Sequence, residues 1–428
     1  MQLGRQVIGR CPINNCQSEK GYADECSLGH QYQPQELLDP VSALSGEKPI
    51  LQEVYNWYLQ LDKLSTPLSD WMEKLESDKR IRKFATSDIK EFFAPPIVYV
   101  HKKNEEDYRS IKENLPSHEE LETKGKSLEL CFHSLSDREL ACDILSEKQI
   151  QYRNGKTLVP FRLTGNIEWG VSVPEEKDLS FWVWPESLWA PISFTSTYLE
   201  SIGKDKDSWT DWWCDPEATV YQFIGEDNVY FYGPAQSALF FGMQGEDAKG
   251  IPEAGELQST ELIVNKHLLF LNSKASSSGS IKPPMAHDLL QQYSTAQLRA
   301  HFISLGLGMK NISFAPKSYN PEASEQDADP VLKESVLLSN IFNRIARNCF
   351  NTIQKFHNSI IPVGVPSTPV LEECNRSIAL FERSMHSKNF HQAFGHAEKL
   401  IRSANKNWSK ESKQLDWNNP GEALNQPL

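Results

Sequence analysis

The sequence predicts two kinds of structure in one chain, an α/β part before the loop 271–284 and an all-helical part after it. Apolar strand-like runs such as 97–100 and 218–225 alternate with helical patterns in the first part. Beyond about residue 331, apolar residues recur at helical spacing. Between the two stands the loop 271–284, which is rich in serine and ends in a double proline that stops regular structure.

Composition narrows the class of protein. A chain of 428 residues is long enough for about three domains, each with its own core. The net charge of -13 argues against indiscriminate binding to nucleic acid, although it leaves room for a local basic face. No apolar run reaches the length of a membrane span, and residues 1–10 lack the apolar segment of a signal peptide. We therefore expect a cytoplasmic protein.

Three cysteines and a histidine crowd into the first thirty residues. Cys11 and Cys16 form one short pair, Cys26 and His30 form another, and an arm with Gly21 joins them. Two tight turns that each present two such ligands suit tetrahedral Zn²⁺. Four protein ligands would close the site and make it structural. The alternative is a group of free thiols beside a surface histidine.

Helical patterning marks residues 51–94, and residues 95–160 form a small inserted α/β unit. In that unit we expect strands at 97–100 and 128–132, a helix at 138–145 and a turn at 153–155. Nothing in it assembles a chemical site.

Two further runs predict the walls of a binding crevice. The aromatic segment 181–194 fits a buried strand that Pro185 breaks into a loop beside an apolar pocket, with plain core packing as the alternative. The run 218–225 fits a second buried strand, followed by a helix from Asp227 to about residue 241. Such a strand-to-helix junction is where open α/β sheets bind ligands. The alternative for Asp227 is a simple helix N-cap.

The loop 271–284 has two interpretations. Three consecutive hydroxyls, Ser276, Ser277 and Ser278, lie between Lys274 and Lys282 and can hold an anion. Alternatively, the loop is a solvated linker between domains, as serine- and glycine-rich segments usually are.

The last part predicts three packed helices, at about 331–356, 369–385 and 390–408, after a capped helix that opens at Ser294. Asn343 and Arg347, four residues apart, share one polar face. Such a face can read unstacked bases, and Trp408 at the exposed end of the last helix can stack on one. The alternative is a face that only meets water, and a tryptophan that only packs.

Taken in order, these motifs resemble bacterial methionyl-tRNA synthetases, from the zinc-bearing connective region onward. The resemblance rests on the knuckle at 11–30, on Trp184 with 190–194, on 223–227 and on the KASSS run 274–278 where the family has its KMSKS loop. It implies a Rossmann-type parallel-sheet catalytic domain, incomplete here, with a zinc knuckle and a small α/β insertion, followed by a helical bundle that binds the anticodon. The implied domains are 1–50, 51–94, 95–160, 161–314 and 315–428.

The resemblance also implies roles for particular residues. The methionine pocket would use Trp184, Ala190, Pro191, Ile192 and Phe194, and the floor of the active site Asp227, Asn228 and Tyr232. Lys274, Ser276, Ser277, Ser278 and Lys282 would serve ATP with Mg²⁺, and Asn343, Arg347 and Trp408 would read the CAU anticodon of tRNA(Met). Cys11, Cys16, Cys26 and His30 would hold Zn²⁺.

The chain departs from the family in several places. No His-x-Gly-His occurs, Ser277 stands where the second loop lysine belongs, Tyr232 replaces a common histidine and Asn228 a common aliphatic residue. Both ends look clipped, so we expect a fragment or one part of a split methionine-tRNA ligase that works with a second chain carrying the HIGH half. The alternatives are a non-catalytic tRNA-binding paralogue and a zinc-stabilised protein-interaction module.

Overall fold

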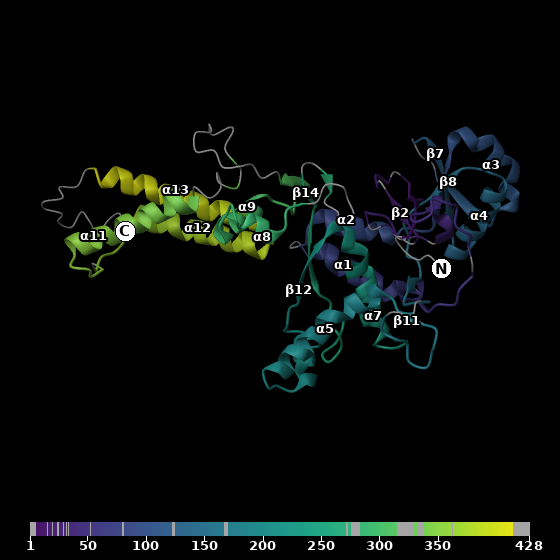
Figure 1. Cartoon of the computed structure of the whole chain (residues 1–428), viewed down its shortest axis with the longest axis horizontal. Helices are drawn as coiled ribbons and strands as arrows, with labels where there is room; N and C mark the ends of the chain where they lie inside the picture. The colour runs from purple at the N-terminus through teal and green to yellow at the C-terminus, as the bar shows by residue number, and fades with distance from the viewer. Residues whose placement is uncertain are drawn as a thin grey trace. The chain divides into compact units, whose positions relative to one another are not determined.

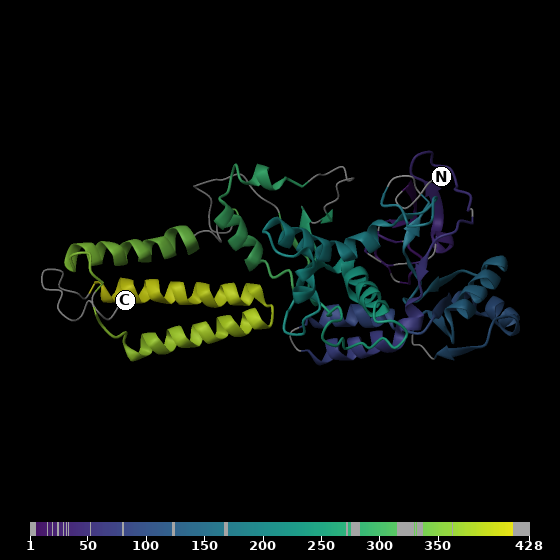
Figure 2. The same cartoon turned by 90° about the horizontal axis from the view of Figure 1, so that it is seen from below.

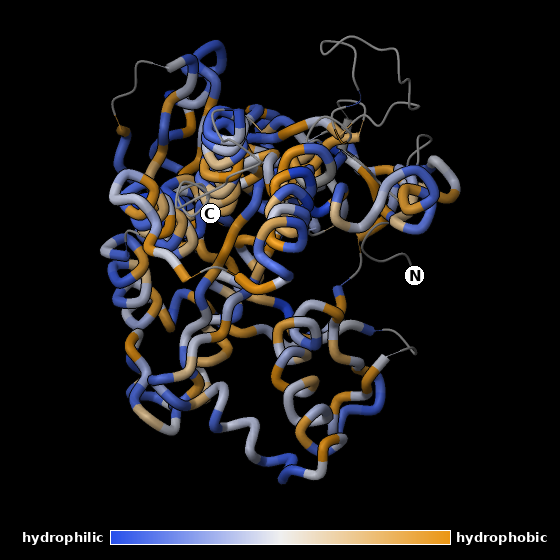
Figure 3. The backbone as a smooth tube through the Cα atoms, turned by 90° about the vertical axis from the view of Figure 1, so that its left-hand side faces the viewer, coloured by the Kyte–Doolittle hydropathy of each residue, from blue (hydrophilic) through white to orange (hydrophobic). Residues whose placement is uncertain are grey.

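The computed structural model describes residues 6–14, 16–18, 20–23, 25–28, 30, 32, 34–51, 53–78, 81–121, 125–166, 170–270, 273–274, 283–314, 329, 331, 337–361 and 363–413. The chain forms two compact units, Met1–Val264 and Asn265–Leu428 (Figures 1 and 2). Along the helices, apolar and polar residues alternate at short intervals, as amphipathic packing requires (Figure 3). Among the described helices, none has the length and apolar content needed to cross a membrane.

The first unit begins with a three-stranded antiparallel sheet of order β2-β1-β3. Its strands are β1 (Val7–Arg10), β2 (Gly21–Tyr22) and β3 (Leu38–Ser42), with the short helix η2 (Pro34–Glu36) before β3. The strands approach so closely that a Cβ on Gly9 would lie 2.5 Å from the carbonyl oxygen of Leu38. Only glycine fits at this position.

Two helices, α1 (Ser65–Ser77) and α2 (Lys83–Phe92), follow η3 (Leu61–Leu64). The sequence predicts a helical region from residue 51, whereas the helices of the structure begin only at Leu61. The segment before the helices forms β4 (Tyr58–Leu59), which pairs with β9 (Phe161–Arg162). The amide of Trp57 donates to the hydroxyl of Thr164 at 2.8 Å, so backbone groups that a helix would need are used by a distant strand.

Residues 97–154 build a four-stranded antiparallel sheet of order β6-β7-β5-β8 with two helices. The elements are β5 (Ile97–His101), α3 (Glu105–Ile111), β6 (His118–Leu121), β7 (Ser127–Phe132), α4 (Leu135–Glu147) and β8 (Tyr152–Asn154). The expected strands and helix are confirmed. The expected turn at 153–155 is wrong, because Arg153 and Asn154 pair with Tyr99 and Val98 as part of β8.

The aromatic segment 181–194 is helical from Val183 onward, which corrects the expected strand. After β10 (Thr164–Gly165) and β11 (Ser180–Phe181), the helix α5 runs over Val183–Ser201. Pro185 lies in its first turn, where a backbone N–H has no helical acceptor to lose. Pro191 lies inside the helix, and the hydroxyl of Thr195 donates to its carbonyl at 2.9 Å. Two prolines in an apolar run conceal a helix from sequence reading.

The main core of the first unit gathers around the helical stretch that follows β12 (Tyr221–Gly225). That stretch comprises η7 (Glu226–Asn228), a π-helical turn η8 (Phe231–Ala235) and α7 (Gln236–Gly242), and β13 (Glu261–Asn265) pairs with β12. The strand predicted within 218–225 is confirmed as β12. The prediction that the strand is buried on both faces is wrong, because Gln222 and Ile224 are buried whereas Tyr221 and Phe223 are exposed. The unit also contains η6 (Lys206–Trp209) and α6 (Thr210–Trp213).

The second unit opens with a three-stranded sheet of order β15-β14-β16. Its elements are β14 (Leu268–Phe270), β15 (Ser273–Lys274), α8 (Ala286–Leu289), α9 (Thr295–Ser304) and β16 (Ile312–Phe314). The pair β14–β16 is parallel, and β15 is antiparallel to β14. The predicted capping box is confirmed, since Ser294 and Gln297 cap each other's backbone at the start of α9.

The rest of the second unit is helical, as predicted. The π-helical segment η9 (Leu337–Phe342) continues into α11 (Asn343–Phe356), and α12 (Thr368–His386) and α13 (Phe390–Glu411) follow. Figure 2 shows the three long helices side by side, and α13 also contacts α9. The chain is thus a mixed α/β protein with a helical C-terminal region, as the sequence predicts.

Candidate functional site

The three cysteines and the histidine of the first knuckle meet in space. One ligand atom from each of Cys11, Cys16, Cys26 and His30 lies within 4.8 Å of all the others. The sulfur of Cys16 is 3.9 Å from that of Cys26 and 3.2 Å from Nδ1 of His30, and Cys11 Sγ is 3.7 Å from the same nitrogen. A tetrahedral zinc site needs sulfur–sulfur edges of about 3.8 Å and sulfur–nitrogen edges of about 3.6 Å. The donor set fits such a site.

Backbone amides support this cluster from two turns. The amide of Ser18 donates to Cys16 Sγ at 3.3 Å, and that of Leu28 donates to Cys26 Sγ at 3.4 Å. The two turns are joined by the Ser18 and Ser27 hydroxyls, which lie 2.6 Å apart. Hydrogen bonds to sulfur stabilise the thiolate, which is the form that binds metal.

The close packing of the four side chains shifts their pKa values in opposite directions. Hydrogen bonds from the thiols of Cys11 and Cys16 hold the pKa of Cys26 far below its usual value, whereas hydrogen bonds with Cys16 and Cys26 raise the pKa of Cys11. Burial alone would lower the pKa of His30, but hydrogen bonds with Cys16 and Cys26 raise it to about 9. The thiolate of Cys26 is thus favoured, whereas Cys11 and His30 hold their protons; a bound metal would displace both protons, because its ligands must be deprotonated.

The structure divides the predicted methionine-pocket residues between two faces of α5. Trp184 stacks on Phe231, with ring centroids 3.5 Å apart, and packs against the main core. Ile192 is buried in a separate cluster with Trp213 and Phe240. Phe194, in contrast, is 69% exposed.

A cavity of about 470 Å³ lies along the other face of the helix, and we call it the α5 cavity. Its lining residues are Leu163, Val171, Phe181, Pro185, Glu186, Trp189, Ala190, Ser193, Phe194 and Leu239. Of the predicted pocket residues, it contains Ala190 and Phe194, whereas Trp184, Pro191 and Ile192 are outside its lining. It is mostly apolar, and among the residues that the structure describes Glu186 is its one charged lining residue.

The predicted active-site floor follows β12 directly. Asp227 and Asn228 lie in η7, and Tyr232 lies in η8, half-buried against the main core. The N-cap of η7 is Gly225, so the alternative of Asp227 as an N-cap is wrong. The Asp227 carboxylate folds back over Gly225, where an added Cβ would lie 2.6 Å from Oδ1. Only glycine leaves room for the carboxylate in this position.

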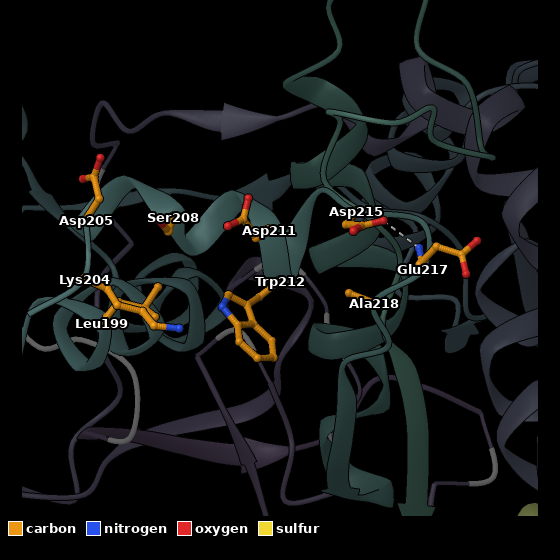
Figure 4. A pocket seen from close by; sticks show the side chains of 9 residues that line it. All are labelled: Leu199, Lys204, Asp205, Ser208, Asp211, Trp212, Asp215, Glu217 and Ala218. Carbon is orange, nitrogen blue, oxygen red and sulfur yellow. Dashed lines mark hydrogen bonds between the residues drawn. The ribbon is translucent and has the colours of Figure 1, made fainter. Parts of the chain in front are cut away.

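A second cavity, of about 510 Å³, is strongly acidic (Figure 4). Its lining residues are Leu199, Lys204, Asp205, Ser208, Asp211, Trp212, Asp215, Glu217 and Ala218. The carboxylate of Asp215 accepts a hydrogen bond from the amide of Glu217 at 2.9 Å. None of the residues predicted from the sequence lines this cavity. Its four carboxylates disfavour phosphate groups.

The serine-rich loop lies mostly outside the described residues. The structure gives Lys274 as part of the backbone of β15, opposite Leu269 of β14. Ser276, Ser277, Ser278 and Lys282 are outside the described part of the chain. Their roles stay predictions.

The predicted anticodon residues have different environments. Asn343 and Arg347 are exposed on α11, as a face that reads bases requires. Trp408 is only 6% exposed, so the expected exposed tryptophan at the end of the last helix is wrong. Helix α13 packs against α12 and η9, and burial of an indole stabilises such packing. Arg344 bridges α11 and α13 by donating to Asn405 Oδ1 at 3.3 Å.

Sequence reasoning missed two charged features of the first unit. Glu186 stands at the wall of the α5 cavity, and it was hidden because the segment was taken for a strand. Arg138 forms a buried ion pair with Glu36, 3.4 Å away. The two residues are 102 positions apart, so no local pattern joins them.

Comparison with known proteins places these features in context. A family model described as tRNA synthetases class I (M) matches residues 3–100 and 144–329. The methionine–tRNA ligase of Corynebacterium kroppenstedtii is 26% identical over 311 residues, which are 70% of this chain and 39% of that protein. The methionine–tRNA ligase of Bifidobacterium longum subsp. infantis is 22% identical over 94% of this chain and 54% of that protein.

A solved structure has the same fold over most of the chain. Methionyl-tRNA synthetase of Mycobacterium tuberculosis, bound by methionyl-adenylate, superposes with a TM-score of 0.53 at 16% identity, covering 91% of this chain and 60% of that one. The chain therefore spans between about two fifths and three fifths of the length of these three proteins. The family model leaves out residues 101–143, which include most of the four-stranded sheet and its helices.

Proposed function

The chain belongs to the family of class I tRNA synthetases (M), and we propose from this premise that it serves as a methionine-tRNA ligase or a part of one. The observation that carries the proposal is the family match over residues 3–100 and 144–329, which is more than half of the chain. The named relatives are methionine–tRNA ligases, which favours methionine as the amino acid.

In the proposed reaction, the carboxylate of methionine attacks the α-phosphorus of ATP, and pyrophosphate leaves with the electron pair of the broken bond. The terminal adenosine of tRNA(Met) then takes the methionyl group, and AMP leaves. The protein forms no covalent bond, so it contributes positioning and positive charge. We assign contact with the phosphates and Mg²⁺ to Lys274, to Ser276–Ser278 as a group, and to Lys282.

Methionine recognition is assigned to side chains of α5 and of the stretch after β12. The proposed set is Trp184, Ala190, Pro191, Ile192, Phe194, Asp227, Asn228 and Tyr232. The thioether of methionine is only a weak hydrogen-bond acceptor. Apolar contacts must therefore supply most of the discrimination between methionine and other amino acids. Because the two faces of α5 differ, Trp184→Ala and Phe194→Ala test them separately. We expect Trp184→Ala to raise the KM for methionine at least about tenfold, the cost of one lost large apolar contact.

We further propose that Cys11, Cys16, Cys26 and His30 hold a structural Zn²⁺. The tetrahedral edges of the cluster support this assignment. Zinc would lock the two turns together. These four residues form a closed ligand set, so the ion has no open position for substrate.

The helical C-terminal region is proposed to bind the CAU anticodon. Asn343 and Arg347 are exposed on one helix and carry the donors that unstacked bases need. Trp408, being buried, is assigned to the packing of the bundle unless binding repacks it.

The test is methionine-dependent ATP–pyrophosphate exchange by the protein in its natural full-length form, alone and with any chain that co-purifies with it. We expect exchange with methionine and none with leucine or isoleucine. Binding of tRNA(Met) without any exchange would replace the proposal with a non-catalytic tRNA-binding paralogue. Equal binding of tRNA with CAU and with scrambled anticodons, again without exchange, would indicate an interaction module instead.

A further inference from the structure

Helix α13 carries a row of positive charges along one side. A lysine or arginine recurs every three or four residues from 399 to 413, so these side chains share one face of the helix and of the turn that follows it. All of them are exposed. The row, which we call the α13 stripe, consists of Lys399, Arg402, Lys406, Lys410 and Lys413. It extends over about 21 Å of helix axis, with neighbouring charges about 5 Å apart.

The stripe lies opposite the packed side of α13. Trp408 is buried in the helical region, and Lys406 and Lys410 lie two residues before and after it, which places them on the opposite face of the helix. Asn405, at the flank of the stripe, accepts a hydrogen bond from Arg344 at 3.3 Å, so α11 adjoins the stripe (Figure 2). The stripe is therefore an open surface for a large partner.

Little of the charge on the stripe is neutralised. Arg402 pairs with Glu398 at 2.6 Å, and Lys410 lies 3.8 Å from Glu411. In the described part of the chain, the other three members form no ion pair. Helix α11 contains no acidic residue at all, whereas α12 mixes both signs, as an ordinary solvated helix does. The one-signed surface is thus confined to the side of the bundle that α11 and α13 share.

The chemistry of the stripe selects its partner. A single small anion can contact only one or two charges of a row this long. A protein partner would need an apolar centre, and among the described residues no exposed large apolar side chain belongs to α13. A nucleic-acid strand presents a phosphate every few ångströms along a helix, which is the pattern that such a row of cations can neutralise. The adjoining face of α11 adds the amide and guanidinium donors of Asn343 and Arg347.

We propose that the α13 stripe binds the phosphate backbone of an RNA stem, whatever its base sequence. Phosphate contacts fix the position of a nucleic acid and carry no sequence information. The net charge of -13 opposes such binding over most of the surface, so the stripe determines where the RNA lies. The proposal goes beyond the ligase function, and it stands whether or not the chain charges tRNA or prefers CAU.

The experiment measures the fluorescence anisotropy of a labelled RNA hairpin, whose loop lacks CAU, during titration with the purified full chain at several KCl concentrations. Binding should weaken steeply as salt rises, because it releases the cations condensed on the RNA. A fourfold variant changes the charged residues within α13 to glutamine, at Lys399, Arg402, Lys406 and Lys410. It should weaken binding at least about tenfold and reduce the slope of log K against log salt by about 3, since each lost phosphate contact removes about 0.7–0.9.

Three further variants separate the stripe from overall charge and from folding. The matched control removes the same number of charges from exposed lysines of the first unit, by changing Lys63, Lys83, Lys148 and Lys177 to glutamine. It should keep the slope. A variant with arginine at Lys399, Lys406 and Lys410 keeps the charge and should bind as the natural protein does. Lys406→Gln alone should reduce the slope by about 0.7–0.9, and thermal unfolding shows whether each variant is folded.

Four results would overturn the proposal. They are no binding of the hairpin by the natural protein, an unchanged slope in the folded stripe variant or in Lys406→Gln, an equal loss in the matched control, and equally tight binding to vesicles of anionic phospholipid. Because the hairpin lacks an anticodon and no ATP is present, failure of the ligase proposal leaves these measurements unaffected.

Discussion

The guanidinium of Arg138 lies 3.4 Å from the carboxylate of Glu36, and both side chains are almost fully enclosed, at 2% and 10% exposure. Glu36 also accepts from the side-chain amide of Asn154, which in turn accepts from the thiol of Cys142 at 3.3 Å. The network joins the four-stranded sheet to the segment that follows the knuckle. It fixes that sheet to the first part of the chain through polar contacts that are buried or part-buried.

Removal of one member of this pair should destabilise the protein strongly. Arg138→Met leaves the carboxylate of Glu36 buried without its cation, which costs about 3–5 kcal/mol of unfolding free energy. Urea unfolding followed by circular dichroism measures the loss. Lys90→Met, which breaks an exposed pair with Glu76, is the control and should cost less than about 0.5 kcal/mol. A double variant, Arg138→Met with Glu36→Leu, should recover only part of the loss, because it removes the unpaired charge but leaves the buried amide of Asn154 without its acceptor. Equal stability of Arg138→Met and the natural protein would contradict a role for this pair.

The zinc cluster predicts a defined metal content. The natural protein should carry one zinc per chain, and Cys26→Ser should lose it, because oxygen replaces a thiolate in a four-ligand site. Mass spectrometry of the native protein and elemental analysis measure the metal directly. Cys374→Ser, a half-buried cysteine on α12 far from the cluster in sequence, is the control and should keep the zinc. If the natural protein contains no zinc and adding zinc does not change its melting temperature, the four residues are free thiols beside a histidine and not a metal site.

The sequence predicted features whose cause is local. The capping box at Ser294, the helices α12 and α13, and the two turns that present Cys11, Cys16, Cys26 and His30 depend on residues close in the chain. Features that depend on residues far apart in the chain were harder to predict from the sequence. Helix α5 was missed because prolines and aromatic side chains obscure its period, and the burial of Trp408 depends on packing that no local pattern encodes. The pair of Arg138 and Glu36 joins segments that the fold alone brings together.

A carboxylate in the four-stranded sheet predicts a response to acid. Burial alone would raise the pKa of Glu120, but hydrogen bonds from Lys112, Tyr108 and Arg109 lower it from 4.5 to about 2. Since the folded-state pKa lies below that of the unfolded chain, these contacts stabilise the protein above pH 4.5, and the stabilisation is lost as the pH falls toward 2. Glu120→Gln should flatten this part of the unfolding free energy against pH, measured by urea unfolding at several pH values. The control is the neighbouring Glu119→Gln, whose unfolding free energy should depend on pH as that of the natural protein does. If Glu120→Gln shows the same pH dependence, the contacts of Glu120 do not stabilise the protein in solution.

Arg347 offers a test of anticodon recognition. Its side chain is exposed on α11, so Arg347→Ala should leave the bundle folded while removing a donor and a stacking plane for a base. The expected loss in binding of a CAU-bearing tRNA is about 1–3 kcal/mol, with a much smaller loss for a scrambled anticodon. Filter binding at fixed salt measures both. Arg376→Ala, an exposed arginine on α12, controls for the loss of one positive charge and should weaken both tRNAs alike. A uniform loss in Arg347→Ala would exclude base reading by this residue.

Trp408 should behave as a packing residue, because its side chain is only 6% exposed. Trp408→Ala is expected to destabilise the helical region by about 3–5 kcal/mol, whereas Trp408→Phe, which keeps most of the apolar volume, should cost far less. Thermal unfolding of the two variants gives the comparison. Below the melting transition, Trp408→Phe should bind CAU-bearing tRNA as the natural protein does. A Trp408→Ala variant that is fully stable but has lost tRNA binding would mean instead that the indole turns outward and stacks on a base.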